Sequence, residues 1–284
     1  MTDPRFTPLR PFDAHNEKLE SNVHPPNWTN PAPQGRYNLV VIGAGTAGLV
    51  AAAGAAGLGA RVALVERALL GGDCLNVGCV PSKAIIACAR AAAAVREAGR
   101  FGVRVPEGAE TDFAAVMERM RKIRADISPH DSARRFTDLG IDVYLGHGEF
   151  VGRDAVEVAG TRLEFSKAVI ATGARAAAPP IEGLDGIEYL TNETVFSVTE
   201  LPPRLGVVGG GPIGCEMAQA FARLGSKVTL FVDEYGILPK DAPDAGSIVG
   251  KRLLHDGVDI RASGSTLSVE KNGEGKILCR EGFG

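Results

Sequence analysis

Cysteine is scarce in this sequence, which has five cysteines among 284 residues. They are too few and too unevenly spaced for the disulfide framework of a small secreted protein. The first ten residues contain proline, aspartate and arginine where a secretory signal needs an apolar core. We therefore expect a cytoplasmic protein, and in a reducing compartment a close pair of cysteines is more often catalytic or metal-binding than structural.

Long apolar runs and an excess of one charge are also missing. No apolar stretch is both long enough and free enough of glycine to indicate a membrane-spanning helix. The formal net charge is −3, which gives no reason to expect nucleic acid or an anionic membrane as a partner. With 45% hydrophobic and 23% charged residues, the composition is that of an ordinary soluble globular protein.

Glycine, by contrast, is abundant, and part of it forms a loop with a clear local context. The apolar run Leu39–Ile42 predicts a strand buried on both faces, and Gly43-x-Gly45-x-x-Gly48 and an alanine-rich helix follow it. In such a loop the first glycine makes a tight turn, the second lets the backbone approach a pyrophosphate, and the third allows close helix–strand packing. Glu66 ends the next predicted strand, where a carboxylate can bind the ribose of a dinucleotide.

The same strand–loop–helix–strand plan recurs further along the chain, with the loop Gly209-x-Gly211-x-x-Gly214. A repeated βαβ unit of this kind predicts two nucleotide sites. After the second strand of this unit, Asp233 stands near the position that reads the ribose. No arginine or lysine is there to bind a 2′-phosphate, so the sequence favours NADH and leaves NADPH open.

The order of the expected elements predicts an α/β fold of three-layer type with two Rossmann-like dinucleotide-binding domains. Between the two βαβ units, short strands separated by glycine-containing turns predict a small β-meander insertion. The proline-rich residues 1–36 predict an extended arm. Meander strands are expected at 143–145, 155–158 and 163–165, a buried strand at 168–171, and helices at 81–98 and about 112–139.

Cys74 and Cys79 lie in a distinctive segment directly after the first βαβ unit. Four intervening residues, one of them glycine, let the two sulfur atoms approach the ~2 Å of a disulfide bond. Pro81 favours the start of a helix, whose dipole would stabilise a thiolate at Cys79. A zinc site would need two more ligands, and the other cysteines and the five histidines show no paired spacing. A redox-active pair is therefore the main interpretation, with a zinc site and an inert pair as the alternatives.

These motifs together resemble the class I pyridine nucleotide–disulfide oxidoreductases, over residues 37 to about 275. The stretch GGDCLNVGCVPSK, residues 71–83, is the most specific part of the resemblance. The Gly-Asp-Cys form and the runs at 171–184 and 190–202 look most like mercuric reductases and mercuric reductase-like proteins. Dihydrolipoyl dehydrogenase-like and glutathione reductase-like enzymes are the alternatives within the family, and a non-catalytic nucleotide-binding fragment is the alternative outside it.

The resemblance implies that electrons pass from NADH or NADPH through FAD to a Cys74–Cys79 disulfide, and on to a small-molecule disulfide or a thiol-bound metal. Cys74 matches the interchange thiol and Cys79 the thiol that contacts the flavin. Lys83 and Glu216 match an ion pair beside the flavin ring. The other positions that match flavin-binding elements are Gly72, Gly148, Thr172 and Gly173.

The resemblance also implies a domain plan. An FAD-binding domain is expected over 37–185 and a partial NAD(P)-binding domain over 186–284, after the N-terminal extension 1–36. The family's chains continue into a dimerisation domain that carries a His–Glu pair, so we expect this chain to be C-terminally truncated and the full-length protein to be a homodimer. The terminal cysteine pair of mercuric reductases is not found in this sequence, so Hg(II) as substrate rests on likeness alone.

Overall fold

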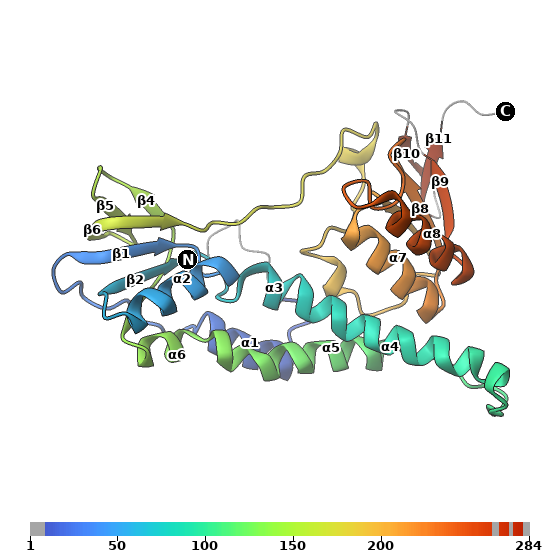
Figure 1. The fold of residues 1–284 in the computed structure, drawn as a ribbon, viewed down its shortest axis with the longest axis horizontal. Helices are drawn as coiled ribbons and strands as arrows, with labels where there is room; N and C mark the ends of the chain where they lie inside the picture. Colours follow the sequence, from blue (N-terminus) through green and yellow to red (C-terminus); the bar gives the residue numbers. More distant parts are fainter. Residues whose placement is uncertain (1–8, 263–266, 273–274, 281–284) are drawn as a thin grey trace. The chain divides into compact units, whose positions relative to one another are not determined.

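The computed structural model of this chain describes residues 9–262, 267–272 and 275–280. Helices and strands are mixed along the chain, which confirms the predicted α/β class. The chain forms two compact units, each made from several segments (Figure 1). The first unit contains residues 1–81, 119–175 and 192–197, and the second contains 82–118, 176–191 and 198–284. The domain limits predicted from the sequence stay predictions.

The first unit is built on a six-stranded sheet with the order β3-β2-β1-β6-β5-β4. The strands are β1 (Tyr37–Ile42), β2 (Val62–Glu66), β3 (Ile141–Leu145), β4 (Gly148–Phe150), β5 (Ala155–Val158) and β6 (Thr161–Ile170). The first three run parallel to one another, and β6 joins them on the other side of β1. The chain order therefore reverses at β1, and the carboxyl ends of β1 and β6 flank a topological switch point.

Apolar side chains on both faces of β1 place it at the centre of the unit. Val41 packs on one face with Leu64 of β2, in a cluster that also contains side chains of the helices α1 (Ala14–Val23), α2 (Thr46–Gly57) and α6 (Ala133–Asp138). Val40 packs on the opposite face with Val65 of β2 and with Leu163 and other residues of the antiparallel strands. Burial on both sides explains why β1 is apolar throughout its centre.

The antiparallel strands β4, β5 and β6 confirm the predicted β-meander, but with different limits. Residues 143–145 belong instead to the parallel strand β3. The strands predicted at 163–165 and 168–171 form one strand, β6. The first part of β6 pairs with β5 and the second part with β1. The predicted burial is wrong at Ile170, whose exposed fraction is 69%.

Residues 9–36 are an ordered part of the first unit, which corrects the prediction of an extended arm. The Asp13 carboxylate caps α1 by accepting hydrogen bonds from two backbone N–H groups. The helix buries Leu19 completely in the core of the unit. Further on, the Asn30 side chain donates to the Leu145 carbonyl at 3.0 Å and accepts from its N–H at 2.8 Å. Within residues 9–36, the prolines lie in the connections before and after the helix α1, which contains none.

The predicted long helices differ in their ends. The helix expected at 81–98 is α4 (Cys79–Glu97), and a short helix α3 (Gly72–Asn76) precedes it. The helix expected at 112–139 is divided into α5 (Phe113–Ile127), the 3₁₀ turn η2 (Ser128–Asp131) and α6. Pro129 lies within η2 and cannot donate the hydrogen bond that a continuous helix needs there.

One helical stretch among the described residues, Gly72–Phe101, is long and apolar enough on length and composition alone to cross a membrane. Only 33% of its most apolar window is buried. Because a core helix of a soluble protein passes the same test, the finding is weak evidence. The expectation of no membrane partner stays a prediction.

The second unit contains a three-stranded parallel sheet with the order β7-β8-β9. The strands are β7 (Arg204–Val208), β8 (Lys227–Val232) and β9 (Asp259–Ala262), and the helices α7 (Pro212–Leu224) and α8 (Pro243–His255) connect them. Strand β7, helix α7 and strand β8 form the second predicted βαβ unit. The remaining elements are the hairpin β10 (Leu267–Asn272) and β11 (Gly275–Arg280) and the 3₁₀ turns η1 (Ala98–Phe101), η3 (Leu184–Gly186) and, in the first unit, η4 (Val195–Ser197).

A buried carboxylate links α7 to the end of α8. The Asp256 side chain is 3% exposed and forms ion pairs with Arg223 at 2.8 Å and Arg252 at 2.9 Å. It also accepts a hydrogen bond from Gln219 at 2.7 Å. Burial alone would raise the pKa of Asp256, but the hydrogen bonds from these three side chains outweigh it and hold that pKa below its usual value. The carboxylate therefore stabilises the folded unit at neutral pH.

Replacing Asp256 by asparagine is expected to destabilise the second unit by about 3 kcal/mol at pH 7, because Arg223 is then buried without its carboxylate. Urea unfolding measures the difference in free energy from the wild type. Because the folded-state pKa is lowered, the difference should persist down to about pH 4 and shrink as the pH falls further, through the folded-state pKa. The matched control is D259N, which removes an exposed ion pair with Arg261 and should cost under about 1 kcal/mol. A difference that persists in strong acid would contradict this assignment.

Candidate functional site

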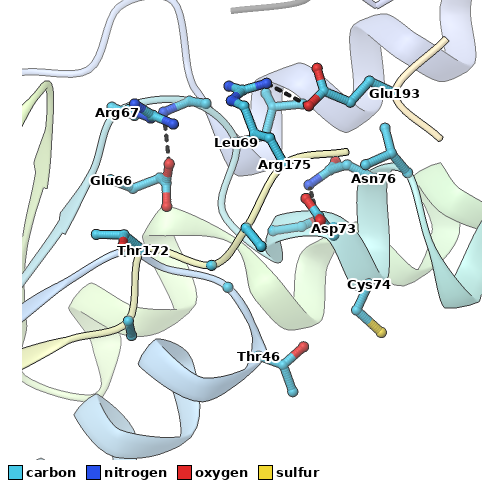
Figure 2. A pocket seen from close by; sticks show the side chains of 18 of the residues that line it. Thr46, Glu66, Arg67, Leu69, Asp73, Cys74, Asn76, Thr172, Arg175 and Glu193 are labelled. Carbon is cyan, nitrogen blue, oxygen red and sulfur yellow. Dashed lines mark hydrogen bonds and ion pairs between the residues drawn. The ribbon is translucent and has the colours of Figure 1, made fainter. Parts of the chain in front are cut away.

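A cavity of about 700 Å³ opens at the carboxyl ends of the parallel strands of the first unit (Figure 2). The connections that follow β1, β2, β3 and β6 all contribute to its wall. Open α/β sheets bind dinucleotides at this place, next to the switch point, and the volume is within the usual range of ligand pockets. The predicted site residues that line it are Gly43, Gly45, Glu66, Gly72, Cys74, Gly148, Thr172 and Gly173.

The first glycine loop is packed too tightly for side chains at two of its three glycines. Gly43 has a φ of +99°, and a Cβ atom there would lie 2.3 Å from the carbonyl oxygen of Ala171. A Cβ on Gly48 would lie 1.8 Å from the carbonyl oxygen of Gly43. Gly45 instead has its nearest neighbour at 3.7 Å, the Cα of Gly72, and precedes the first residue of α2. The loop therefore exposes bare backbone and a helix N-terminus to the cavity, an arrangement that suits a pyrophosphate.

Glu66 lies at the end of β2 and on the cavity wall, where the sequence places it. Its carboxylate oxygens accept hydrogen bonds from the backbone N–H groups of Ala44, at 2.7 Å, and Ala68, at 2.8 Å. These bonds fix the glycine loop to the connection after β2, a role that the sequence did not indicate. A carboxylate has about four acceptor positions, so Glu66 can still accept hydrogen bonds from a ribose.

Cys74 and Cys79 are not joined by a disulfide bond, and their side chains lie close together. Cys74, on α3, lines the cavity, whereas Cys79 begins α4 and is exposed. Burial raises the pKa of Cys74, and a hydrogen bond with the Cys79 thiol raises it further, while a hydrogen bond with Thr46 opposes these effects. Two thiols within hydrogen-bonding reach need only a small movement to form a disulfide. Which of them contacts a flavin stays a prediction.

A charged cluster that the sequence did not single out lies on the cavity wall near Cys74 (Figure 2). Arg175, beyond the end of β6, donates a hydrogen bond to Glu193 at 2.5 Å. Burial and then the charge of Glu193 raise the pKa of Asp73, whereas Arg175 lowers it. The only sequence signal for this cluster is the aspartate directly before Cys74, because the partners lie far along the chain.

The second glycine loop shares two features of the first, a positive φ at its first glycine and close packing at its third, but a Cβ on Gly209 would have no atom within 4 Å. Gly209 has a φ of +113°, and a Cβ on Gly214 would lie 2.0 Å from the carbonyl oxygen of Gly209. Gly211 precedes the first residue of α7. Asp233 directly follows β8, is exposed, and accepts a hydrogen bond from the N–H of Tyr235 at 3.0 Å. Nucleotide binding by this loop and ribose recognition by Asp233 stay predictions.

The ion pair expected between Lys83 and Glu216 is present in the second unit. The Lys83 ammonium lies 2.8 and 2.9 Å from the two carboxylate oxygens of Glu216. The side chains are 58% and 33% exposed, and a solvated pair of this kind contributes at most about 1 kcal/mol to stability. The position of the pair beside a flavin ring stays a prediction.

Comparison with known proteins gives consistent matches to one family. Residues 37–282 match the sequence model of the family described as pyridine nucleotide-disulphide oxidoreductase. The mercuric reductase of Streptomyces lividans is 36% identical over 256 residues, which are 87% of this chain and 53% of the relative. The dihydrolipoyl dehydrogenase of Acholeplasma laidlawii is 34% identical over 239 residues, which are 82% of this chain and 70% of the relative.

A similar solved structure is also a disulfide reductase. The HOCl-induced flavoprotein disulfide reductase RclA from Escherichia coli is 30% identical, with a TM-score of 0.69 over 85% of this chain and 54% of that chain. The mercuric reductase of Lysinibacillus sphaericus shares 32% identity over 84% of this chain, but only 43% of its own length is covered. This chain thus spans about half the length of most of the curated relatives and solved structures that it matches.

Proposed function

The chain belongs to the pyridine nucleotide-disulphide oxidoreductase family, and from this premise we propose that it forms the flavin- and cysteine-bearing part of an NAD(P)H-dependent reductase. The observation that supports the proposal most strongly is the place of Cys74 on the wall of the cavity beside the first glycine loop, with Cys79 within hydrogen-bonding reach. In the proposed reaction, electrons reach this cysteine pair and pass to a disulfide or a thiol-bound metal.

The residues of the cavity fit FAD. The tight packing at Gly43 and Gly48 leaves backbone N–H groups at the start of α2 open for a diphosphate. Glu66, Thr172 and Gly173 line the wall of the cavity, and Glu66 is the residue that we propose for binding the ribose. When bound, FAD supplies the transfer of two electrons from NADH or NADPH to a disulfide, which no side chain can perform.

The cysteine pair then completes the exchange in steps that balance. Two electrons and two protons break the S–S bond between Cys74 and Cys79 and give two thiols. One thiolate attacks a substrate disulfide, forms a mixed disulfide and releases the first substrate thiol. The other cysteine attacks the mixed disulfide, releases the second substrate thiol and re-forms the Cys74–Cys79 bond. For Hg(II) held by the thiolates of Cys74 and Cys79, two electrons would pass from the two sulfur atoms to the metal. The metal would leave as Hg(0) as the two Hg–S bonds break and the Cys74–Cys79 disulfide re-forms.

The reactivity of Cys74 is expected to rise at a higher pH than that of an ordinary cysteine, whose pKa is about 8.5. Burial raises the pKa of Cys74, so its thiolate is disfavoured at neutral pH. Alkylation of the reduced protein with iodoacetamide, read at Cys74 by tandem mass spectrometry across a pH series, measures this midpoint. An unstructured cysteine peptide in the same tube is the control. A Cys74 midpoint at or below that of the peptide would contradict the assignment.

The substrate is the finer part of the proposal, and mercuric reductase-like activity is the first candidate. The similarity to dihydrolipoyl dehydrogenase supports a second candidate, the oxidation and reduction of a dithiol such as lipoamide. Loss of NADH or NADPH absorbance by the full-length protein, with Hg(II) plus excess thiol, lipoamide or glutathione disulfide, separates them. We expect Hg(II) to be turned over fastest. Turnover of none of the three would defeat the proposed function.

A further inference from the structure

Arg124 on α5 is a buried cation with no carboxylate partner among the described residues. Its exposed fraction is 3%. One terminal nitrogen donates to the backbone carbonyl of Asn76 at 2.6 Å, and the other donates to the side-chain oxygen of Asn16 at 2.6 Å. The Nε atom is buried and has no hydrogen-bond partner. All of these contacts lie within the first unit.

The neighbouring Arg121 shows what a neutralised arginine looks like in the same helix. It is 8% exposed and forms an ion pair with Asp13 at 2.5 Å. Asp13 is therefore already engaged, and it acts on Arg124 only as a more distant charge. Burial and the charge of Arg121 lower the pKa of Arg124 to about 10, and Asp13 opposes them. Arg124 is still protonated at neutral pH.

A buried guanidinium without a counter-charge is costly, since burial disfavours the charged form and hydrogen bonds to neutral groups return only part of the lost hydration. Asn76 also has a buried side-chain oxygen without a partner. A buried water bonded to this oxygen or to the Nε atom of Arg124 would not neutralise the charge. Arg124 lines the same cavity as the first glycine loop, so an anionic ligand there could supply the missing counter-charge.

We propose that Arg124 is a cofactor-binding residue that balances the charge of the dinucleotide's diphosphate, and that Asn16 of the N-terminal segment positions it. The inference rests on the proposed function, because it takes FAD as the ligand of the cavity. Asn16 is suited to this task, since its amide nitrogen donates to the carbonyl of Pro11 at 2.7 Å and so turns its oxygen toward Arg124. Residues 9–36 thereby gain a role in cofactor binding.

The first test compares R124Q with R124K and with the matched control R121Q in the 284-residue chain. Titrations with FAD, ADP and riboflavin measure affinity, and thermal unfolding measures the stability of the ligand-free protein. R124Q should lower the affinity for FAD and for ADP by about 10- to 100-fold. The affinity for riboflavin, which carries no charge, should not change. R124K should recover part of the loss, because it keeps the charge. R121Q should lower the melting temperature and leave the FAD to riboflavin affinity ratio unchanged.

The second test is N16D, which places a carboxylate beside Arg124 and so creates an internal competitor for the diphosphate. This substitution should lower the affinity for FAD and for ADP by about tenfold and leave the affinity for riboflavin unchanged. If R124Q lost affinity for FAD and riboflavin equally, or if R124Q or N16D bound FAD as tightly as the wild type, the inference would be wrong while the proposed function could stand. Failure of the wild type to bind FAD, ADP or riboflavin would overturn both the inference and the proposed function.

Discussion

Replacing Gly48 by alanine is expected to abolish FAD binding and to destabilise the first unit by about 3–5 kcal/mol. The added Cβ would lie 1.8 Å from the carbonyl oxygen of Gly43, a backbone atom that cannot rotate away. Relief of this clash would push α2 away from β1 and open the loop that we expect to hold the diphosphate. Retention of FAD after gel filtration and urea unfolding of the purified variant measure the two effects.

The matched control for this substitution lies in the same helix. Gly54 is also in α2, and a Cβ there would have no atom within 4 Å. G54A should therefore leave FAD binding intact and stabilise the unit by about 0.5–1 kcal/mol, because alanine loses less conformational entropy in a helix. If G48A bound FAD as tightly as the wild type, the first glycine loop would not be the diphosphate site.

Replacing Cys74 or Cys79 by serine in the full-length protein is expected to lower NAD(P)H-dependent substrate reduction by about a thousandfold or more. A serine hydroxyl can neither form the disulfide nor take part in thiol–disulfide exchange, so either change interrupts the path. NAD(P)H oxidation with a dye that takes electrons directly from the flavin should continue in both variants. The ratio of the two activities is therefore the informative measurement.

Two other cysteines provide controls for the serine variants. C88S changes a half-buried cysteine of α4 and C215S a buried cysteine of α7, and neither residue has a role in the proposed exchange. Both should keep substrate reduction at the wild-type rate after correction for stability. Persistent substrate reduction in C74S or C79S would mean that electrons leave the flavin by another route.

The parts of the fold that the sequence predicted are those set by local sterics. Residue 48 must be glycine because a Cβ there would meet the carbonyl oxygen of Gly43 in the same loop. The apolar run of β1 is buried on both faces, as its lack of alternation predicts. The cysteine spacing is equally local. Such features need no knowledge of distant segments.

The parts that the sequence did not predict depend on distant partners. Strand β6 is continuous because two neighbours, β5 and β1, pair with its two halves, and neither is visible in the sequence of β6 itself. In the sequence, Arg124 is one of several polar residues of an amphipathic helix. Its partners Asn16 and Asn76 lie 108 and 48 positions away, so only the fold shows that it is buried between them. Arg175 and Glu193 are likewise joined only by the fold.

The N-terminal helix α1 shows a different limit. The prolines on either side of this helix led us to predict an extended arm. Instead, the cap by Asp13 and the burial of Leu19 and Val23 stabilise a helix of ten residues. A helix this short is marginal by itself in water, so tertiary packing decides whether it forms. The apolar surface that receives it belongs to segments far along the chain, and composition alone could not reveal that surface.

The most direct test of the central claim is a count of thiols in the oxidised, FAD-loaded full-length protein. Each cysteine is labelled and identified by mass spectrometry before and after anaerobic addition of one equivalent of NADH or NADPH. We predict that two new thiols appear, at Cys74 and Cys79, while Cys88 and Cys215 are unchanged. Appearance of no new thiol, or of thiols elsewhere in the chain, would contradict an electron path from the flavin cavity to this cysteine pair.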